Sequence, residues 1–138
     1  MAGTFHLQVV TPEREIFSGD VDQVVLPGAE SSFGVLRNHA PLIAALQAGV
    51  VRYFDAENRE HNLVIGGGFF QVSDNQAMIL ADSAEKPQEI DVARARESEI
   101  RARGRLEGTL DPEMKVQRDR AAAALKRAQV RLKNAGGS

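Results

Sequence analysis

The residues of this chain that could carry out chemistry are few, and a glycine triplet is the first of them. Gly66-Gly67-Gly68 follows an apolar segment, as glycines do in phosphate-binding loops. A P-loop also needs Lys-Ser/Thr after its glycines and a helix that begins there, whereas Phe69-Phe70 and another apolar run follow here. We therefore expect a turn, a bulge or a close approach of two backbones at these glycines.

Catalytic and metal-binding patterns are not found in the sequence. There is no Cys, which excludes disulfides and thiolate chemistry, and His6, His39 and His61 show no metal-ligand spacing. No Ser/His/Asp arrangement can be identified, and the carboxylates of the first part lie mostly near turns. We predict no catalytic residue and no metal site. His39 either hydrogen-bonds backbone carbonyls in its loop or forms part of a contact surface.

Basic residues gather near the C-terminus and could bind an anion. The acidic residues of this segment are Glu113 and Asp119, and its basic residues are Lys115, Arg118, Arg120, Lys126, Arg127, Arg131 and Lys133. This segment forms either a solvated basic face or a binding surface. A binding surface would take an acidic protein, an anionic small ligand or nucleic acid. Nucleic acid is disfavoured because this segment has no aromatic side chains to stack on bases and the whole chain is mildly acidic.

The elements that must position these residues divide into two kinds. Over the first ~83 residues, short β-branched and aromatic runs alternate with turn signals such as Pro27-Gly28, Asp55 to Asn58 and Ser73-Asp74-Asn75. This spacing favours an all-β sandwich or barrel. We predict an N-terminal antiparallel β-sandwich over residues 1–85, followed by a C-terminal antiparallel two-helix hairpin over residues 86–138.

The hairpin is predicted from the change of pattern after Pro87. Residues 90–103 contain no Gly or Pro. A weak apolar stripe with one acidic interruption is formed by Ile90, Ala93, Glu97 and Ile100. Breaks are expected at Gly104 and at Gly108-Thr109, and Asp111-Pro112 is typical of a helix start. A second helix over 112–134 would place on its seam Met114, Arg118, Ala121, Leu125, Ala128 and Leu132.

Composition and charge indicate two parts with different partners. Residues 1–85 hold 4 Lys/Arg against 11 Asp/Glu, whereas residues 86–138 hold 13 against 8. No apolar run approaches the ~20 residues of a membrane-spanning helix, and residues 1–6 have no basic or apolar segment typical of a signal or transit peptide. We expect a protein kept in the cytoplasm. Its hairpin, with stripes rich in Ala, should be conformationally mobile and need something to dock on.

Several stretches taken together resemble the epsilon subunits of bacterial F-type ATP synthases over essentially the whole chain. Their order is the specific feature: Phe17 to Val21, Val25 to Gly28, Phe33 to Leu36, Asn38 to Leu42, Gly67 to Phe69, Ala81 to Glu85 and Ile90 to Ala95. The chain departs from the family pattern at Ser31-Ser32, where a Gly-containing turn is frequent, and at Arg37, where Pro is common. These departures concern the shape of the loops.

The resemblance implies a rotor subunit that couples proton flow to ATP synthesis and is not itself an enzyme. The β domain would contact the gamma subunit and the c-ring through Gly28, Ala29, Glu30, Ser31, Ser32, Asn38, His39, Ala40, Pro41 and Leu42. The helices would extend along gamma, insert among the alpha and beta subunits and inhibit ATP hydrolysis. The residues implied to meet an acidic stretch of the beta subunit are Lys115, Arg118, Arg120 and Lys126.

The resemblance also implies a regulatory ATP site, because Ile90 to Ala95 matches the Ile/Leu-Asp-x-x-Arg-Ala motif of epsilon subunits that bind ATP. Asp91 would accept from the adenine amino group, and Arg94 would pair with phosphates. The implied set is Glu85, Ile90, Asp91, Arg94, Ala95, Arg101, Arg127 and Arg131. The alternative is that Asp91 caps the helix or pairs within the hairpin. The resemblance thus implies ATP, with or without magnesium, as a regulatory ligand, and it implies no obligatory cofactor.

Localisation and the competing hypotheses follow from these inferences. The chain is expected at the cytoplasmic face of the bacterial cell membrane, as a peripheral component that meets the membrane only through its complex and binds no nucleic acid. One alternative is a freestanding nucleotide-binding sensor, which would be stable alone and have no affinity for gamma. The other is a nucleic-acid-binding module, whose binding to DNA would depend steeply on salt.

Overall fold

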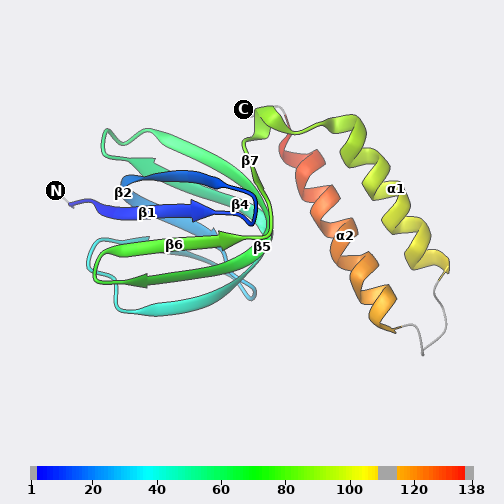
Figure 1. Ribbon diagram of the computed structural model, residues 1–138, viewed down its shortest axis with the longest axis horizontal. Helices are drawn as coiled ribbons and strands as arrows, with labels where there is room; N and C mark the ends of the chain where they lie inside the picture. Colours follow the sequence, from blue (N-terminus) through cyan, green and yellow to red (C-terminus); the bar gives the residue numbers. More distant parts are fainter. Residues whose placement is uncertain (1–2, 109–114, 136–138) are drawn as a thin grey trace. The chain divides into compact units, whose positions relative to one another are not determined.

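The computed structural model describes residues 3–108 and 115–135, the side chains of residues 107, 108 and 115–118 excepted. The chain splits into two compact units, Met1–Lys86 and Pro87–Ser138. The first unit consists of strands and the second of helices, as Figure 1 shows. The predicted fold class, a β-sandwich followed by two helices, is confirmed.

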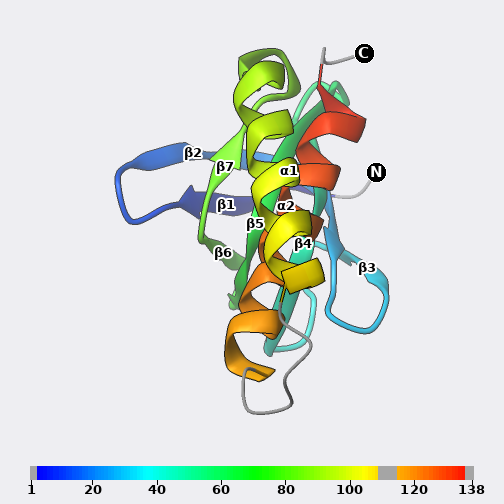
Figure 2. The same cartoon turned by 90° about the vertical axis from the view of Figure 1, so that its right-hand side faces the viewer.

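The strands of the first unit form one closed, sandwich-like sheet. They are β1 (Phe5–Val10), β2 (Glu15–Pro27), β3 (Ser32–Leu36), β4 (Leu42–Asp55), β5 (Glu60–Ser73), β6 (Gln76–Ala81) and β7 (Ala84–Glu85). Their order is β1-β6-β5-β4-β2-β3, β7 pairs with β5, and an additional β1–β2 pairing closes the sheet. Figures 1 and 2 show the strands folding over one another. All pairings between strands are antiparallel except β1–β6, which is parallel.

The core of this unit comes from the alternating positions of the strands. In β1, Phe5, Leu7 and Val9 are buried while the residues between them are partly exposed. This alternation follows from the period of two residues along a strand. Other strands contribute Val21, Val24, Leu26, Val35, Val51, Leu63, Ile65, Phe70 and Ile79. Each such aliphatic or aromatic side chain contributes about 1.5–3 kcal/mol when fully buried, so the sandwich has a substantial core of its own.

The glycine triplet lies inside a strand and not in a turn. β5 runs through Gly66, Gly67 and Gly68 without interruption, so of the expected alternatives a turn is ruled out. The expected close approach of two backbones is confirmed, because a Cβ on Gly68 would overlap the backbone oxygen of Leu80. At this point β5 changes its partner from β6 to β7. The triplet therefore serves packing and strand exchange, not phosphate binding.

The turn between β4 and β5 is held by one carboxylate. Asp55 Oδ1 accepts from the backbone N–H groups of Glu57 and Arg59, both at 2.9 Å, and Asp55 Oδ2 lies 3.0 Å from His61 Nε2. The His61 hydrogen bond, followed by that of the Arg59 backbone, lowers the pKa of Asp55 to about 2. The Tyr53 ring stacks on His61 with centroids 5.0 Å apart, and burial raises the pKa of Tyr53.

The second unit begins with the 3-10 turn η1 (Pro87–Glu89) and continues with α1 (Val92–Gly108) and α2 (Lys115–Asn134). Asp91 Oδ1 accepts from the backbone N of Arg94 at 3.1 Å, which caps the start of α1. The predicted break at Gly104 is wrong, because α1 continues to Gly108. A glycine inside a helix costs only ~1 kcal/mol, which packing on a second helix can offset. The predicted helix start at Asp111-Pro112 lies outside the described residues.

The helices run antiparallel, side by side, along a narrow alanine seam (Figures 1 and 2). Ala95 and Ala102 on α1, and Ala121 and Ala128 on α2, are each at most 2% exposed. The predicted α1 stripe is wrong at Ala93 and Ile100, which are exposed; Glu97, its acidic interruption, is exposed as well. On α2 the predicted seam is confirmed at Ala121 and Ala128, while Leu125 and Leu132 are half-buried. Met114 and the Arg118 side chain lie outside the described residues.

Candidate anion-binding face of the helical hairpin

The arginines of α1 lie on one side of the alanine seam. Arg94 directly precedes Ala95, and Arg101 directly precedes Ala102, so each is turned about 100° from its buried neighbour in the same direction. Arg105 follows Arg101 by four residues and therefore lies on the same side, one turn further along. All three side chains are exposed.

The arginines of α2 repeat this arrangement. Arg120 precedes Ala121, Arg127 precedes Ala128, and Arg131 follows Arg127 by four residues. Because the two helices are antiparallel, residues that precede a seam position on either helix lie on the same side of the hairpin. One surface of the hairpin, which we call the basic face, therefore carries Arg94, Arg101, Arg105, Arg120, Arg127 and Arg131.

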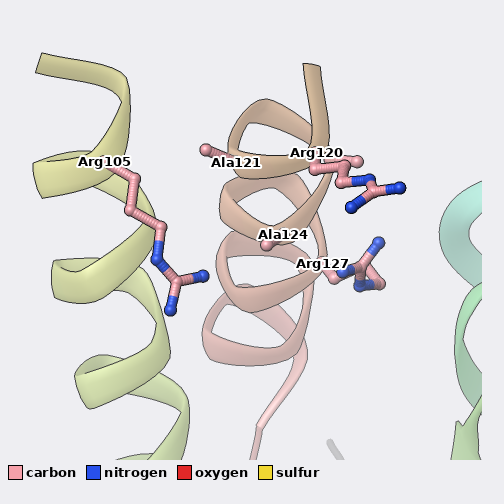
Figure 3. Close-up of a pocket in the computed structure, with 6 residues that line it drawn as sticks. Arg105, Arg120, Ala121, Ala124 and Arg127 are labelled. Atoms are coloured by element: carbon pink, nitrogen blue, oxygen red, sulfur yellow. The ribbon is translucent and has the colours of Figure 1, made fainter. Parts of the chain in front are cut away.

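A pocket of about 500 Å³ lies on the basic face. It is lined by Arg105, Arg120, Ala121, Ala123, Ala124 and Arg127. Figure 3 shows Arg105 pointing from α1 toward α2, and Arg120 and Arg127 pointing to the same side of α2. The alanines have short side chains and leave space beside the guanidinium groups. Guanidinium groups present several N–H donors in a fixed fork that suits phosphate and carboxylate groups, so this arrangement can bind an anion.

Asp91 lies at the end of the basic face where α1 begins. Its Oδ1 accepts from the backbone N of Arg94 and so caps α1, which is the role that the alternative interpretation of this residue predicts. A carboxylate has two oxygens and about four lone-pair sites, so capping and ligand binding are compatible. Asp91 is one of the hydrogen-bond acceptors for an amino group there, and Glu97, three residues after Arg94 and four before Arg101, is a second carboxylate on the same side of α1.

The structure brings together most, but not all, of the residues predicted to bind ATP. Asp91, Arg94, Arg101, Arg127 and Arg131 share the basic face, and Arg101 Nη2 also donates to Ser98 Oγ at 3.3 Å. Ile90 and Ala95 are buried, so they shape the hairpin and do not offer surface to a ligand. Glu85 belongs to β7 of the first unit.

One residue of the basic face was missed by sequence reasoning. Arg105 lines the pocket together with Arg120 and Arg127, although the expected helix break at Gly104 separated it from α1. The signal that could have identified it is its spacing of four residues from Arg101, which places both on the same side of a continuous helix.

Of the four residues predicted to contact the beta subunit, the structure describes the side chains of Arg120 and Lys126, which lie on different sides of α2. Arg120 lies on the basic face. Lys126 is exposed but lies about 100° round α2 from Arg127, so it points to another side. The side chains of Lys115 and Arg118 lie outside the described residues.

The first predicted contact loop, Gly28 to Ser32, borders a second pocket, of about 310 Å³. Gly28 O accepts from Gln47 Nε2 at 3.0 Å, and Ala29 N donates to Ala45 O at 3.0 Å, so β4 fixes the start of this loop. The pocket is lined by Gly28, Ala29, Glu30, Ser31, Phe33, Ala44 and Ala45. Ser32 opens β3.

The second predicted contact loop, Asn38 to Leu42, joins β3 to β4. His39 Nδ1 lies 2.6 Å from Ala40 O, so this histidine does hydrogen-bond a carbonyl of its own loop. Ala40 and Pro41 are exposed, and Leu42 opens β4. Asn38 N donates a hydrogen bond to Asn75 Oδ1 in the turn between β5 and β6.

The described part of the chain contains neither a metal-binding cluster nor a membrane-spanning helix. Over residues 3–108 and 115–135, no group of three or more His, Asp or Glu side chains is arranged to hold a metal ion. In the same residues, no helix has the length and apolar character needed to span a membrane.

Comparison with known proteins gives the class of this chain. Residues 4–87 match the family model "ATP synthase, Delta/Epsilon chain, beta-sandwich domain". Residues 88–136 match "ATP synthase, Delta/Epsilon chain, long alpha-helix domain". The chain belongs to the ATP synthase delta/epsilon family, as its sequence motifs predicted.

Individual relatives agree with this assignment. The ATP synthase epsilon chain of Nitratidesulfovibrio vulgaris (strain DP4) is 41% identical over 138 residues and is covered in full, as is this chain. That of Syntrophomonas wolfei is 42% identical over 94% of this chain and 93% of its own. A chain of the Euglena gracilis mitochondrial ATP synthase has the same fold, with a TM-score of 0.77, 21% identity and coverage of 94% and 80%. Family membership confirms the prediction of a subunit that is not an enzyme in its own right.

Proposed function

We propose that the chain is a central-stalk subunit that couples proton translocation to ATP synthesis and inhibits ATP hydrolysis through its helices. Support comes from relatives named as ATP synthase epsilon chains and from two units of opposite charge. The acidic sandwich would sit on the gamma subunit and c-ring, and the basic hairpin would dock among the alpha and beta subunits. In this role the chain meets the cytoplasmic face of the membrane only through its complex.

The basic face of the hairpin is the observation on which the regulatory part of the proposal depends. Six arginines and Asp91 share one side of two packed helices. In the proposed site, Arg94, Arg127 and Arg131 pair with the phosphates of ATP, and Asp91 accepts from the adenine amino group. Bound phosphates would relieve the mutual repulsion of the guanidinium groups, which favours the closed hairpin.

The alanine seam explains why a ligand could control the hairpin. Burying an alanine methyl contributes far less than the ~1.5–3 kcal/mol of a buried leucine or isoleucine. ATP that binds only the closed hairpin stabilises it by about 2.7 kcal/mol at a hundredfold excess over Kd. Such a contribution is of the same order as that of the four buried seam alanines, at about 0.8 kcal/mol for each methyl group. At low ATP the helices would separate, extend and inhibit hydrolysis.

The test of this site is a calorimetric titration of the full chain with ATP. Arg94→Ala should weaken ATP binding about tenfold or more, because hydrogen bonds to charged groups contribute about 1.5–3 kcal/mol. Arg96→Ala is the matched control, since it removes an exposed arginine of the same helix turn from the other side of the seam. Equal affinities for the two variants would remove Arg94 from the site.

A further inference from the structure

Two asparagines that are 37 positions apart form a reciprocal pair of hydrogen bonds. Asn38 N donates to Asn75 Oδ1 at 2.7 Å, and Asn75 Nδ2 donates to Asn38 Oδ1 at 3.1 Å. Asn38 belongs to the loop between β3 and β4, and Asn75 to the turn between β5 and β6. We call this pair the asparagine clasp. It ties the predicted contact loop to a turn that carries no part of the family motifs.

The backbone at both ends of the clasp has an unusual conformation. Asn38 has φ 64° and Asn75 has φ 60°, both in the left-handed region. Asparagine enters this region more readily than most residues, because its short amide can hydrogen-bond nearby backbone. Here both amides bond across to the other segment, so the two turns fix each other's conformation.

Asn75 is in turn anchored to the core of the sandwich. Its backbone oxygen accepts from His6 N at 3.0 Å, which joins it to the buried strand β1. Leu42, at the end of the loop, pairs with Val72 of β5, while the bonds of His39 are local: His39 N donates to Leu36 O at 3.3 Å, and His39 Nδ1 lies 2.6 Å from Ala40 O. The clasp is thus a connection from the loop to the rigid part of the unit.

The surface beside the clasp has the character of a contact region. A pocket of about 290 Å³ is lined by Pro41, Leu42, Ile43, Gln71, Val72, Ser73 and Gln76, and so lies between the end of the loop and the β5–β6 turn. Ile43, which lines this pocket, is 77% exposed and so is available to a partner. The position of the loop decides how Pro41 and Ile43 are presented.

We propose that Asn75 is a positioning residue for partner binding. By holding Asn38 through the clasp, it fixes the loop Asn38 to Leu42 in the shape that meets the neighbouring subunits. This inference rests on the proposed function, in which that loop contacts gamma and the c-ring. Asn75 itself need not touch the partner.

The variant that tests this role is Asn75→Gly in the full chain, because glycine keeps the left-handed backbone and removes only the amide. Asp74→Gly is the matched control: Asp74 also has a left-handed backbone, at φ 52°, in the same turn. Binding to ATP synthase depleted of its own epsilon chain should weaken on the order of tenfold for Asn75→Gly relative to Asp74→Gly. Asn75→Asp keeps the acceptor for Asn38 N and should bind between the two.

Two measurements separate the possible outcomes. Amide exchange of Asn38 in the isolated chain should accelerate in Asn75→Gly and not in Asp74→Gly, whereas both variants should remain folded at the temperature of the binding assay. Equal binding of the two glycine variants to the depleted enzyme, or unchanged exchange at Asn38, would overturn the positioning role. If the wild-type chain itself failed to bind the depleted enzyme, the proposed function would be wrong, and this inference with it.

Discussion

The Asp55 carboxylate shows how a single residue can make a turn of this chain sensitive to pH. It accepts from Glu57 N, Arg59 N and Arg59 Nε, and it contacts His61. Its pKa is about 2 in the folded state, against roughly 3.9 for an unperturbed Asp. A lowered pKa means that the unfolded chain takes up the proton first as the pH falls. The stabilisation is therefore present above pH ~4 and lost as the pH falls to about 2.

Asp55→Asn should lower the free energy of unfolding at pH 7, and the difference from wild type should shrink as the pH falls from ~4 to ~2. Urea unfolding at pH 7, 5, 3 and 2 measures this. Asp74→Asn removes a carboxylate from another turn and serves as the control. A difference for Asp55→Asn that stays constant over this range would contradict the pKa argument.

Single residues also mark how far the sequence can be interpreted. The Asp91 motif was recognised, but capping and ligand binding could not be separated, since both use the same carboxylate. The asparagine clasp could not be predicted, because its partners are distant in sequence and become neighbours only through the packing of two turns. Short-range patterns identify turns, whereas contacts between turns depend on the fold.

At the scale of elements, periodicity predicted the type of each unit better than the face that each helix buries. The strand alternation and the α2 seam at Ala121 and Ala128 were correctly predicted. On α1 the predicted stripe follows the large side chain of Ile100, whereas the helices approach through small alanines and leave Ile100 69% exposed. The parallel β1–β6 pairing was also missed, because it joins the first strand to the sixth.

Two glycines give opposite predictions at this scale. Gly68→Ala should destabilise the sandwich by more than ~1 kcal/mol, because Gly68 has φ 150° and an added Cβ would overlap Leu80. Gly104→Ala should stabilise α1 by roughly 0.5–1 kcal/mol, because no atom lies within 4 Å of its added Cβ. Thermal unfolding followed by circular dichroism measures both. A stable Gly68→Ala variant or a destabilised Gly104→Ala variant would show that these local accounts are wrong.

At the scale of the whole molecule, the two units differ in what stabilises them. The sandwich has a core of large aliphatic and aromatic side chains, whereas the described seam of the hairpin consists of alanines. The units also carry opposite net charge, with 4 Lys/Arg against 11 Asp/Glu before residue 86 and 13 against 8 from there on. An acidic unit with a large core, joined to a basic unit with a small one, agrees with the proposed function. In that proposal the sandwich binds its partners and the hairpin changes conformation.

The most direct test of the regulatory role is the ATPase rate of the depleted enzyme after addition of the full chain or of residues 1–86. At low ATP, the full chain should bind and inhibit hydrolysis, whereas residues 1–86 should bind equally well and leave the rate high. Raising ATP should relieve the inhibition by the full chain, because ATP bound at the proposed site would favour the closed hairpin. Equal rates with the two proteins, at equal binding and at low ATP, would contradict the proposed inhibition by the helices.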